Sequence, residues 1–380
     1  MPAEEDLAKF CSKLIQTPSM SGEEKEVAVL IRDEMNSLGF DRTWIDEAGN
    51  VAGLLSGSGA GPTIVLEGHM DTVPPGRLEE WKVPPFSGAL IDGWIYGRGA
   101  ADMKGAIASM VYSATKLGEI DSDVYMVFVV HEEDQEGFGI RHFVQREGLR
   151  PDLVVIGEAT KLNIAVGHRG RVEVRLRAEG RTAHSSMPQL GESALEKMID
   201  ALVRLRTLSK EFPEHPVLGR STVAAVAISC SPGQIPVIPD VCEALLDYRL
   251  VPGETLEEVL GRLSSLVAGL HAEVVKRTLR CYTGLEAEVT AYFPAWYQPS
   301  TLAQELARTL NADVTVWKFG TDGSYTAGEA GFATVGYGPG DEALAHRPNE
   351  RVSIRDLELA VAGYSKIVLW AERVLTRGGT

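Results

Sequence analysis

The chain has 380 residues and a formal net charge of −16, from 37 basic and 53 acidic side chains. This length suffices for two or three domains, and 44% hydrophobic with 24% charged residues is typical of a globular protein. The acidic balance argues against nucleic-acid binding and against docking on anionic membranes, since both need a basic face.

The N-terminus and the apolar runs indicate a cytoplasmic location. Glu4, Glu5 and Asp6 make the N-terminus acidic, whereas a secretory signal begins with basic residues and continues with apolar ones. The most apolar run, 124–130, is far shorter than the roughly 18 residues that span a bilayer. We therefore expect a cytoplasmic protein without a membrane span.

The cysteines do not indicate a metal site or a disulfide framework. Cys11, Cys230, Cys242 and Cys281 form no closely spaced pair, and disulfides are rare in a reducing compartment. Cys230 and Cys242 could lie on neighbouring strands, but we expect free, buried thiols, as is usual for cysteine.

Helices and strands alternate in the first part of the chain, which predicts an α/β domain with a largely parallel sheet. Apolar residues at helical spacing predict helices over 23–38 and 104–117. The expected strands are 51–55, 63–67, 124–130 and 153–156.

The middle of the chain has a different pattern. Residues 171–178 alternate strictly between polar and apolar, as in a sheet with one face in water. The elements expected after it are a helix at 193–209, strands at 221–229 and 241–250, a helix at 255–270 and a strand at 272–278. This β-α-β-β-α-β order is that of ferredoxin-like domains.

After residue 285 the alternation of helices and strands returns, with elements expected at 301–310, near 314, near 334 and at 354–374. The simplest division is one domain formed by 1–168 and 285–380, interrupted by a second domain at 169–284. The predicted fold class is α/β, with a mixed, largely parallel sheet flanked by helices and an inserted ferredoxin-like α+β domain.

Residues able to carry chemistry follow the predicted strands, where ligands bind in open α/β sheets. His69 and Asp71 follow the strand at 63–67, and their spacing places both side chains on one face of an extended chain. His69 could bind a metal while Asp71 orients its ring, although many such pairs are only hydrogen-bonded.

Carboxylates recur at similar positions. Asp102 lies in a glycine-rich turn before a predicted helix, where it could cap the helix or bridge two metal ions. Glu132 and Glu133 follow the strand at 124–130, and adjacent side chains of an extended chain point in opposite directions. One of them could bind a metal while the other stays free as a base; otherwise both are solvated in an acidic turn.

Glu158 also follows a predicted strand, and His346 follows a glycine-rich segment. With His69, Asp102 and Glu133 they form a set of two histidines and three carboxylates. Such a set suits two zinc ions that share one carboxylate. Because no thiolates are available for a closed structural site, an open catalytic site is favoured.

These motifs, in their order along the chain, resemble those of the M20 family of dizinc peptidases and deacylases, which includes acetylornithine deacetylase, succinyl-diaminopimelate desuccinylase and aminoacylase. The resemblance covers essentially the whole chain. It rests on 68–72 (Gly-His-Met-Asp-Thr), 97–105 (Gly-Arg-Gly-Ala-Ala-Asp-Met-Lys-Gly), 132–133 (Glu-Glu), 157–160 (Gly-Glu-Ala-Thr) and 345–346 (Ala-His). Segments 108–112, 292–296 and 345–350 look most like a branch grouped with selenium-metabolism hydrolases.

The resemblance implies a catalytic dizinc domain in which two metal sites share one carboxylate. The implied ligands are Asp102 as the bridge, His69 and Glu158 for one ion, and Glu133 and His346 for the other. Glu132 would be the general base and acid, acting on a water that the two zinc ions share, and Asp71 would orient the ring of the first histidine.

In the insert the resemblance implies a lid and dimerisation domain. His184, in the segment 182–186, would cross a homodimer to polarise the scissile carbonyl in the partner subunit. Arg249, in the segment 247–249, would contact a substrate carboxylate. Apart from the resemblance, Arg169 could help to hold a carboxylate or could equally be a surface arginine. Without the resemblance, His184 would be an ordinary hydrogen-bonded histidine and Arg249 a salt-bridged strand residue.

The function that the resemblance implies is a metal-dependent amidohydrolase cleaving the amide bond of N-acyl amino acids or related small compounds. Glu158, in place of an aspartate, favours deacylation. The alternatives are a dipeptidase or carboxypeptidase on the same scaffold and, from another class, a metal-free binding or scaffold protein. The expected cofactors are two divalent ions, zinc or else cobalt or manganese, and the expected partners are a small-molecule substrate and a second copy of the chain.

Overall fold

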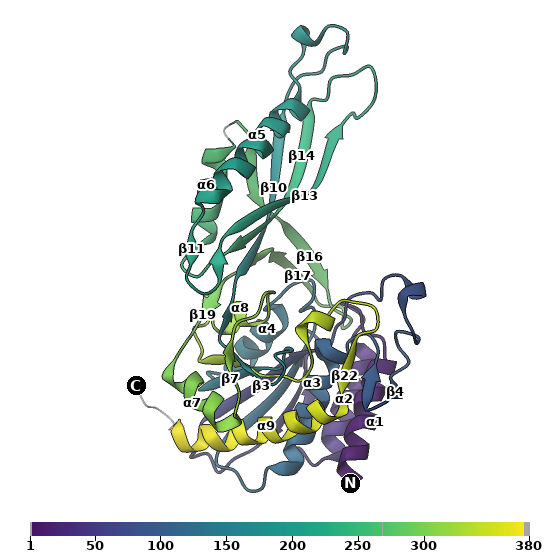
Figure 1. Cartoon of the computed structure of the whole chain (residues 1–380), viewed down its shortest axis with the longest axis vertical. Coiled ribbons are helices and arrows are strands. Elements are labelled where there is room, and N and C mark those ends of the chain that lie inside the picture. Colours follow the sequence, from purple (N-terminus) through teal and green to yellow (C-terminus); the bar gives the residue numbers. More distant parts are fainter. Residues whose placement is uncertain (1, 268, 376–380) are drawn as a thin grey trace.

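A computed structural model describes residues 2–267 and 269–375 of the chain. They form a large domain, which holds the first and last described helices, and an elongated domain that projects from it (Figure 1). None of the described helices is long and apolar enough to cross a membrane.

Eight strands form the central sheet of the large domain, in the order β1-β2-β6-β3-β7-β21-β8-β20. Their bounds are β1 Arg42–Ile45, β2 Val51–Leu55, β3 Thr63–His69, β6 Asp123–Val129, β7 Leu153–Ile156, β8 Ile164–Ala165, β20 Val314–Thr315 and β21 Thr334–Gly336. The four strands β6, β3, β7 and β21 are parallel, whereas β1–β2, β2–β6 and β21–β8 are antiparallel pairs. The predicted mixed, largely parallel sheet is confirmed.

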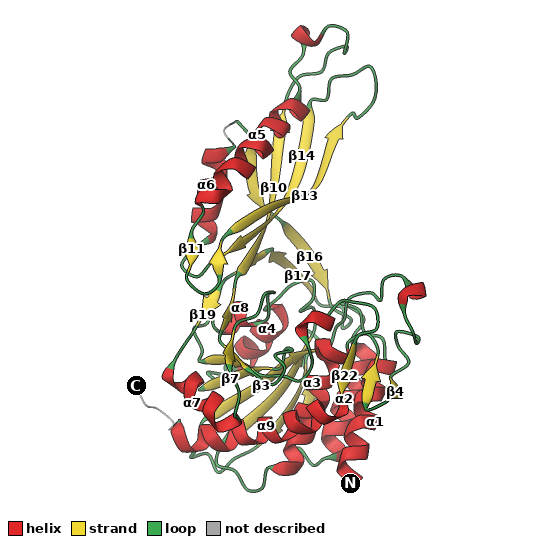
Figure 2. Ribbon diagram, viewed as in Figure 1, coloured by secondary structure: helices red, strands yellow, loops and turns green. Residues whose placement is uncertain are grey.

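Helices cover both faces of this sheet (Figure 2). The helices of one face are α1 Pro2–Gln16, α2 Lys25–Ser37, α3 Gly105–Ser113, α7 Thr301–Leu310 and α9 Ile354–Val374, and those of the other are α4 Phe138–Glu147 and α8 Gly323–Thr326. Within β3, Leu66 enters the first apolar core and Val65 enters the second. The strand is therefore buried on both faces, as parallel strands usually are.

The projecting domain is an antiparallel sheet of order β13-β14-β10-β15 with two helices on one face (Figure 2). Its elements are β10 Gly170–Glu179, α5 Ala194–Leu208, β13 Thr222–Ser231, β14 Val241–Leu250, α6 Leu256–Leu266 and β15 His271–Val274. This is the ferredoxin-like order that the sequence predicts. The domain has an apolar core of its own, while the domain limits at 168/169 and 284/285 stay a prediction.

Short strands complete the fold. They are β4 Ala89–Ile91, β5 Trp94–Tyr96 and β22 Arg351–Ser353 in one small sheet, β9 Gly167–His168 paired with β19 Trp296–Tyr297, β11 Glu214–His215 paired with β12 Gly219–Arg220, and β18 Tyr292–Phe293 beside β10.

The expected strand at 272–278 is divided in the structure, so this prediction is wrong. β15 ends before Val275, and the chain then forms β16 (Lys276–Arg280), which pairs with β17 (Glu286–Thr290). The cause is a change of partner at Val275, whose N–H donates to Glu173 while its carbonyl accepts from Ala291. The β16–β17 hairpin lies between the two domains (Figure 1).

The expectation of free thiols is also wrong for one pair of cysteines. Cys230 on β13 and Cys242 on β14 lie directly opposite each other, with Cα atoms 4.1 Å apart, and are joined by a disulfide. The register of the two strands, which composition cannot reveal, brings them together. Cys11 and Cys281 are free and buried, as expected.

A buried histidine lies where the chain passes from the large domain into the insert. Nδ1 of His168 is 2.9 Å from the carbonyl oxygen of Arg169, and Nε2 accepts the backbone N–H of Thr321 at 3.1 Å. A carbonyl only accepts and a backbone N–H only donates, so the ring is neutral with its proton on Nδ1. Burial lowers the pKa of His168 to about 4.

This ring predicts a loss of stability in acid. A histidine in the unfolded chain has a pKa of about 6.5, so the unfolded state takes up the proton first and the free energy of unfolding falls as the pH drops from about 6.5 toward 4. At about pH 5 the contribution is about 2 kcal/mol. The free energy of unfolding, measured with urea, should fall between about pH 8 and about pH 5. In His168→Gln this fall should be smaller than in the wild type by the same amount.

His271→Gln is the matched control, because His271 is an exposed residue of β15. This variant should keep the wild-type pH dependence. Equal pH dependence in the wild type and in His168→Gln would contradict the assignment of a neutral, buried ring.

Candidate metal centre

The carboxyl ends of three neighbouring parallel strands meet at one edge of the central sheet. His69 is the last residue of β3, Glu132 and Glu133 follow β6, and Glu158 follows β7. Because parallel strands end at the same edge, residues far apart in the sequence converge there.

Asp102 reaches the same place from a tight turn before α3. Its backbone is held by Glu350, which is buried and whose Oε1 accepts the N–H groups of Ala101 and Asp102 at 2.9 and 3.1 Å. The other oxygen of Glu350 pairs with the buried guanidinium of Arg98 at 2.5 Å. This buried ion pair fixes the turn that presents Asp102, a role that the sequence analysis did not assign to either residue.

The two oxygens of Asp102 face two different groups of side chains. Oδ1 is 3.0 Å from Nε2 of His69, which is in turn 3.2 Å from Oε1 of Glu158. Oδ2 is 3.1 Å from Nε2 of His346, which is 3.0 Å from Oε2 of Glu133. All five residues named as ligands in the sequence analysis are therefore brought together, with Asp102 in the middle.

Charge and burial shift the titration of these groups. Burial raises the pKa of Glu158 to about 7 and that of Glu132 well above its usual range. Burial would also raise the pKa of Asp102, but hydrogen bonds from His346 and His69 bring it below its usual range. Hydrogen bonds to Asp102 and Glu133 raise the pKa of His346. The cluster thus favours positive charge beside its carboxylates.

The donor set fits divalent cations. Ligand atoms of His69, Asp102 and Glu133 lie within 4.8 Å of one another, as do those of His69, Glu132 and Glu158. Oε1 of Glu132 and Oε2 of Glu158 are buried and have no hydrogen-bond partner among the described residues. A buried carboxylate oxygen without a partner is costly, and nitrogen and oxygen donors of this kind bind zinc, cobalt or manganese.

Asp71 links the strand ends that carry these residues. Its backbone carbonyl lies 2.9 Å from Nδ1 of His69, while its carboxylate is 3.6 Å from the same nitrogen. The carboxylate accepts the N–H groups of Glu132 and Glu133, each at 3.1 Å, and the hydroxyl of Ser21 at 2.6 Å. Asp71 therefore orients His69 mainly through its backbone and holds the acidic turn through its side chain.

A cavity of about 380 Å³ opens beside this cluster. Its lining beyond the ligand residues consists of Glu132, Glu136, Arg171, Arg249, Phe319, Gly320, Glu342 and Ala345. Arg171 and Arg249 come from the insert, where they lie directly opposite each other on β10 and β14. The insert therefore forms one wall of the cavity.

The two arginines are held by carboxylates. Arg249 makes a two-pronged contact with Asp247 at 2.8 and 3.0 Å, and Arg171 lies 3.2 Å from Glu136. The sequence analysis did not identify Arg171 or Glu136. The alternation within 171–178 is the one signal for Arg171, since it puts this residue on the polar face of its strand.

Two predicted residues lie away from the cavity within this single chain. Arg169 donates to the carbonyl of Arg220 at 3.2 Å and is not among the described residues that line the cavity. His184 is exposed and its Nδ1 accepts the N–H of Ser186 at 3.2 Å. It belongs to the loop between β10 and α5, which reaches the far tip of the insert (Figure 1).

Comparisons with known proteins agree with these motifs. The model of "Peptidase family M20/M25/M40" matches residues 65–370. The uncharacterized protein YgeY of Escherichia coli K12 is 33% identical over 381 residues, covering 96% of this chain and 94% of its own. A probable carboxypeptidase of Aspergillus terreus is 30% identical over 393 residues, covering 94% and 85%.

The fold has solved counterparts as well. The crystal structure of a tripeptidase from Staphylococcus aureus superposes with a TM-score of 0.76 at 22% identity, covering 97% of this chain and 99% of its own. That likeness shows the fold, and the sequence matches confirm the resemblance read from the motifs. Because the family model spans residues 65–370 of 380, the chain belongs to peptidase family M20/M25/M40.

Proposed function

We propose that the chain is a metal-dependent amidohydrolase that cleaves the amide bond of N-acyl amino acids or related small compounds. The observation that carries the proposal is the position of Asp102 between two groups of proposed ligand side chains, near Glu132, whose buried Oε1 has no hydrogen-bond partner among the described residues. Membership of a peptidase family supports amide hydrolysis as the reaction.

Two divalent ions, most simply zinc, would be held by these side chains. The proposed ligands are His69, Asp102 and Glu158 for one ion and Asp102, Glu133 and His346 for the other. When bound, such a pair polarises an amide carbonyl and makes an attacking water more acidic.

Glu132 would move the proton. It would take a proton from the attacking water and give it to the departing nitrogen, so that the C–N bond breaks and a neutral amine leaves. Burial, which raises the pKa of Glu132, suits a group that must act as both base and acid near neutral pH. Asp71 supports this role, because its carboxylate holds the N–H of Glu132 at 3.1 Å.

Arg249 would bind the substrate's carboxylate. It lines the cavity and its guanidinium is fixed by Asp247, which reduces the side-chain entropy lost on binding. Arg169 is not among the described residues that line the cavity, so we assign the carboxylate contact to Arg249 and give Arg169 a supporting role. The alternative of a metal-free scaffold protein gains no support, because buried carboxylates that converge on one place are costly and a scaffold does not require them.

A peptidase reaction is the second candidate, because the relative from Aspergillus terreus is named a probable carboxypeptidase. The bond, the proposed ligands and Glu132 are the same in both reactions. A screen of N-acetyl and N-succinyl amino acids against dipeptides, with zinc, cobalt or manganese added, separates them.

We expect kcat/KM for the best acyl amino acid to exceed that for the best dipeptide by at least about tenfold, which corresponds to about 1.4 kcal/mol in transition-state binding. The reverse order would establish the peptidase reaction. Turnover that is indifferent to a chelator, with no metal in the purified protein, would rule out both.

Glu132→Gln should lower kcat by about 10²- to 10⁴-fold, the usual contribution of a general base, while metal analysis still finds two ions per chain. Glu133→Gln is the matched comparison at the next residue, and it should reduce the metal content as well as the rate. Wild-type turnover by Glu132→Gln would refute the role proposed for Glu132.

We also propose a homodimer through the insert, in which His184 enters the partner's cavity. The support is the exposed apolar surface along β13 and α5. Val226 and Ile228 are 59% and 50% exposed, and Ile199 and Val203 are 48% and 50% exposed, which is costly unless a second copy covers them.

Mixing two inactive variants tests this arrangement. His184→Ala should lose about 10²- to 10³-fold in kcat if His184 stabilises the developing oxyanion. After subunit exchange with Glu132→Gln, half the dimers are mixed and each has one complete site, so about a quarter of the wild-type activity should return. No recovery, or a chain that is monomeric and fully active, would contradict the proposal.

A further inference from the structure

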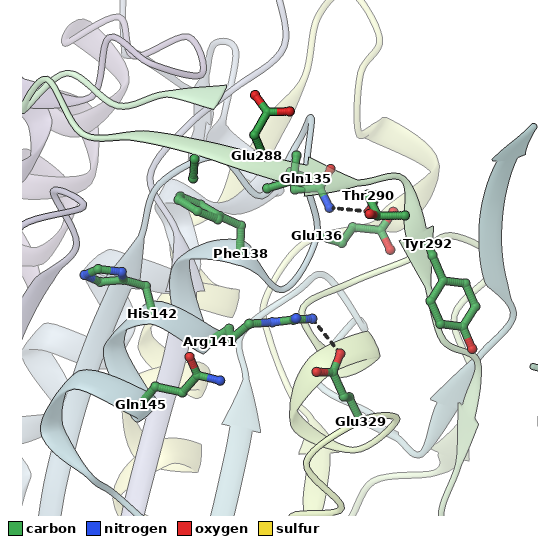
Figure 3. Close-up of a pocket in the computed structure, with 12 residues that line it drawn as sticks. Gln135, Glu136, Phe138, Arg141, His142, Gln145, Glu288, Thr290, Tyr292 and Glu329 are labelled. Carbon is green, nitrogen blue, oxygen red and sulfur yellow. Dashed lines mark hydrogen bonds and ion pairs between the residues drawn. The ribbon is translucent and has the colours of Figure 1, made fainter. Parts of the chain in front are cut away.

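A second cavity of about 380 Å³ lies between α4 and the hairpin strand β17. Figure 3 shows β17 crossing above it and side chains of α4 below. Its lining is Gln135, Glu136, Phe138, Arg141, His142, Gln145, Ala287, Glu288, Val289, Thr290, Tyr292 and Glu329. Only Glu136 among the described residues is shared with the cavity beside the metal centre.

The hairpin presents its backbone edge to this cavity. Four consecutive residues of β17, 287–290, line it. Side chains alternate between the two faces of a strand, so consecutive residues can share one cavity only when the edge faces it. Within the described residues β17 pairs with β16 alone, which leaves that edge without a neighbouring strand.

One buried side chain already uses this edge. Nε2 of Gln135 donates to the carbonyl of Thr290 at 3.1 Å (Figure 3), in the position that the N–H of a paired strand would take. Gln135 is 6% exposed, and its Oε1 has no hydrogen-bond partner among the described residues. A buried amide oxygen of this kind requires a donor, and the N–H of an added strand would supply one.

The charges around the cavity favour a basic ligand. The lining includes three carboxylates, those of Glu136, Glu288 and Glu329, and one guanidinium, that of Arg141. Arg141 pairs with Glu329 at 2.5 Å (Figure 3), and Glu136 is paired with Arg171 of the other cavity. Within the described part of the chain, Glu288 has the hydroxyl of Thr278 as its one partner and is exposed, so no described basic side chain neutralises its charge.

We propose that this cavity binds an extended basic peptide, which adds as a strand to the edge of β17 that no described strand covers. Strand addition supplies main-chain hydrogen bonds, and pockets for alternate side chains supply selectivity. A lysine or arginine of the peptide would face Glu288, and Phe138 and Tyr292 would contact its aliphatic parts. The proposal concerns binding and holds whichever amide bond the metal centre cleaves.

The test uses a fluorescent peptide, Lys-Val-Lys-Val-Lys blocked at both ends, and fluorescence anisotropy on the metal-loaded Glu132→Gln protein. This variant keeps the peptide intact during the titration; peptide cleavage in this sample would refute the role of Glu132 and not the binding site. We expect saturable binding, and protection of residues 286–290 from hydrogen exchange when the peptide is bound.

Two N-methylated peptides show whether binding is strand pairing. N–H groups of alternate residues point to the same edge of a strand. Methylation of residues 2 and 4, or of 1, 3 and 5, therefore removes the donors of one edge at a time. One of these peptides should lose at least about tenfold in affinity while the other binds like the parent. Equal binding of both would overturn the proposal.

Glu288→Lys should weaken binding by about five- to tenfold, because it replaces an attraction by a repulsion. Glu286→Lys is the matched control: Glu286 is also an exposed residue of β17, but it pairs with Arg280 and does not line the cavity. Affinity should change by less than about twofold there. If both variants lost affinity equally, the effect would reflect the overall charge of the protein and not a contact with Glu288, which would overturn the assigned site.

Discussion

The structure depends on the cost of placing several carboxylates at one buried edge of a sheet. Asp102, Glu132 and Glu158 are each less than a tenth exposed, and burial alone raises the pKa of each of them. Two histidines cannot neutralise this charge while remaining metal ligands, because a ligating imidazole must be neutral. In a metal-bound site, bound cations would therefore take over from the histidine protons in stabilising these charged carboxylates.

The surrounding structure is built to keep these carboxylates in place. Glu350 and Arg98 form a buried ion pair behind Asp102, and removal of one partner from such a pair costs about 3–5 kcal/mol. Asp71 performs the same task for Glu132 and Glu133 by accepting both of their N–H groups. The proposed metal ligands are thus positioned by charged residues outside the ligand set.

Much of this could be predicted from the sequence, because local patterns determine it. The strands at 153–156 and 241–250 and the helix at 354–374 have the predicted bounds in the structure. The ligand types follow from motifs that end strands, since parallel strands bring those motifs to one edge. The helix α4 was not predicted, because its apolar residues are few and glycines flank it.

What could not be predicted depends on register and on contacts distant in sequence. Arg171 reaches the cavity because it lies opposite Arg249, and Cys230 meets Cys242 for the same reason. The change of partner at Val275, which creates the β16–β17 hairpin, also depends on contacts distant in sequence, such as that between Val275 and Glu173. A strand keeps the same amino-acid composition, and the same inward and outward faces, when its pairing shifts by two residues. Composition therefore does not select the observed register.

The hairpin matters because it contacts the turn that carries Glu132. Arg277 of β16 donates to the carbonyl of Asp134 at 3.3 Å, and Gln135 donates to Thr290 of β17. These contacts lie two and three residues beyond Glu132, in a turn whose other end is held by Asp71. A displacement of the insert would therefore reach Glu132, the proposed base, through the hairpin, because the turn between them is short and held at both ends.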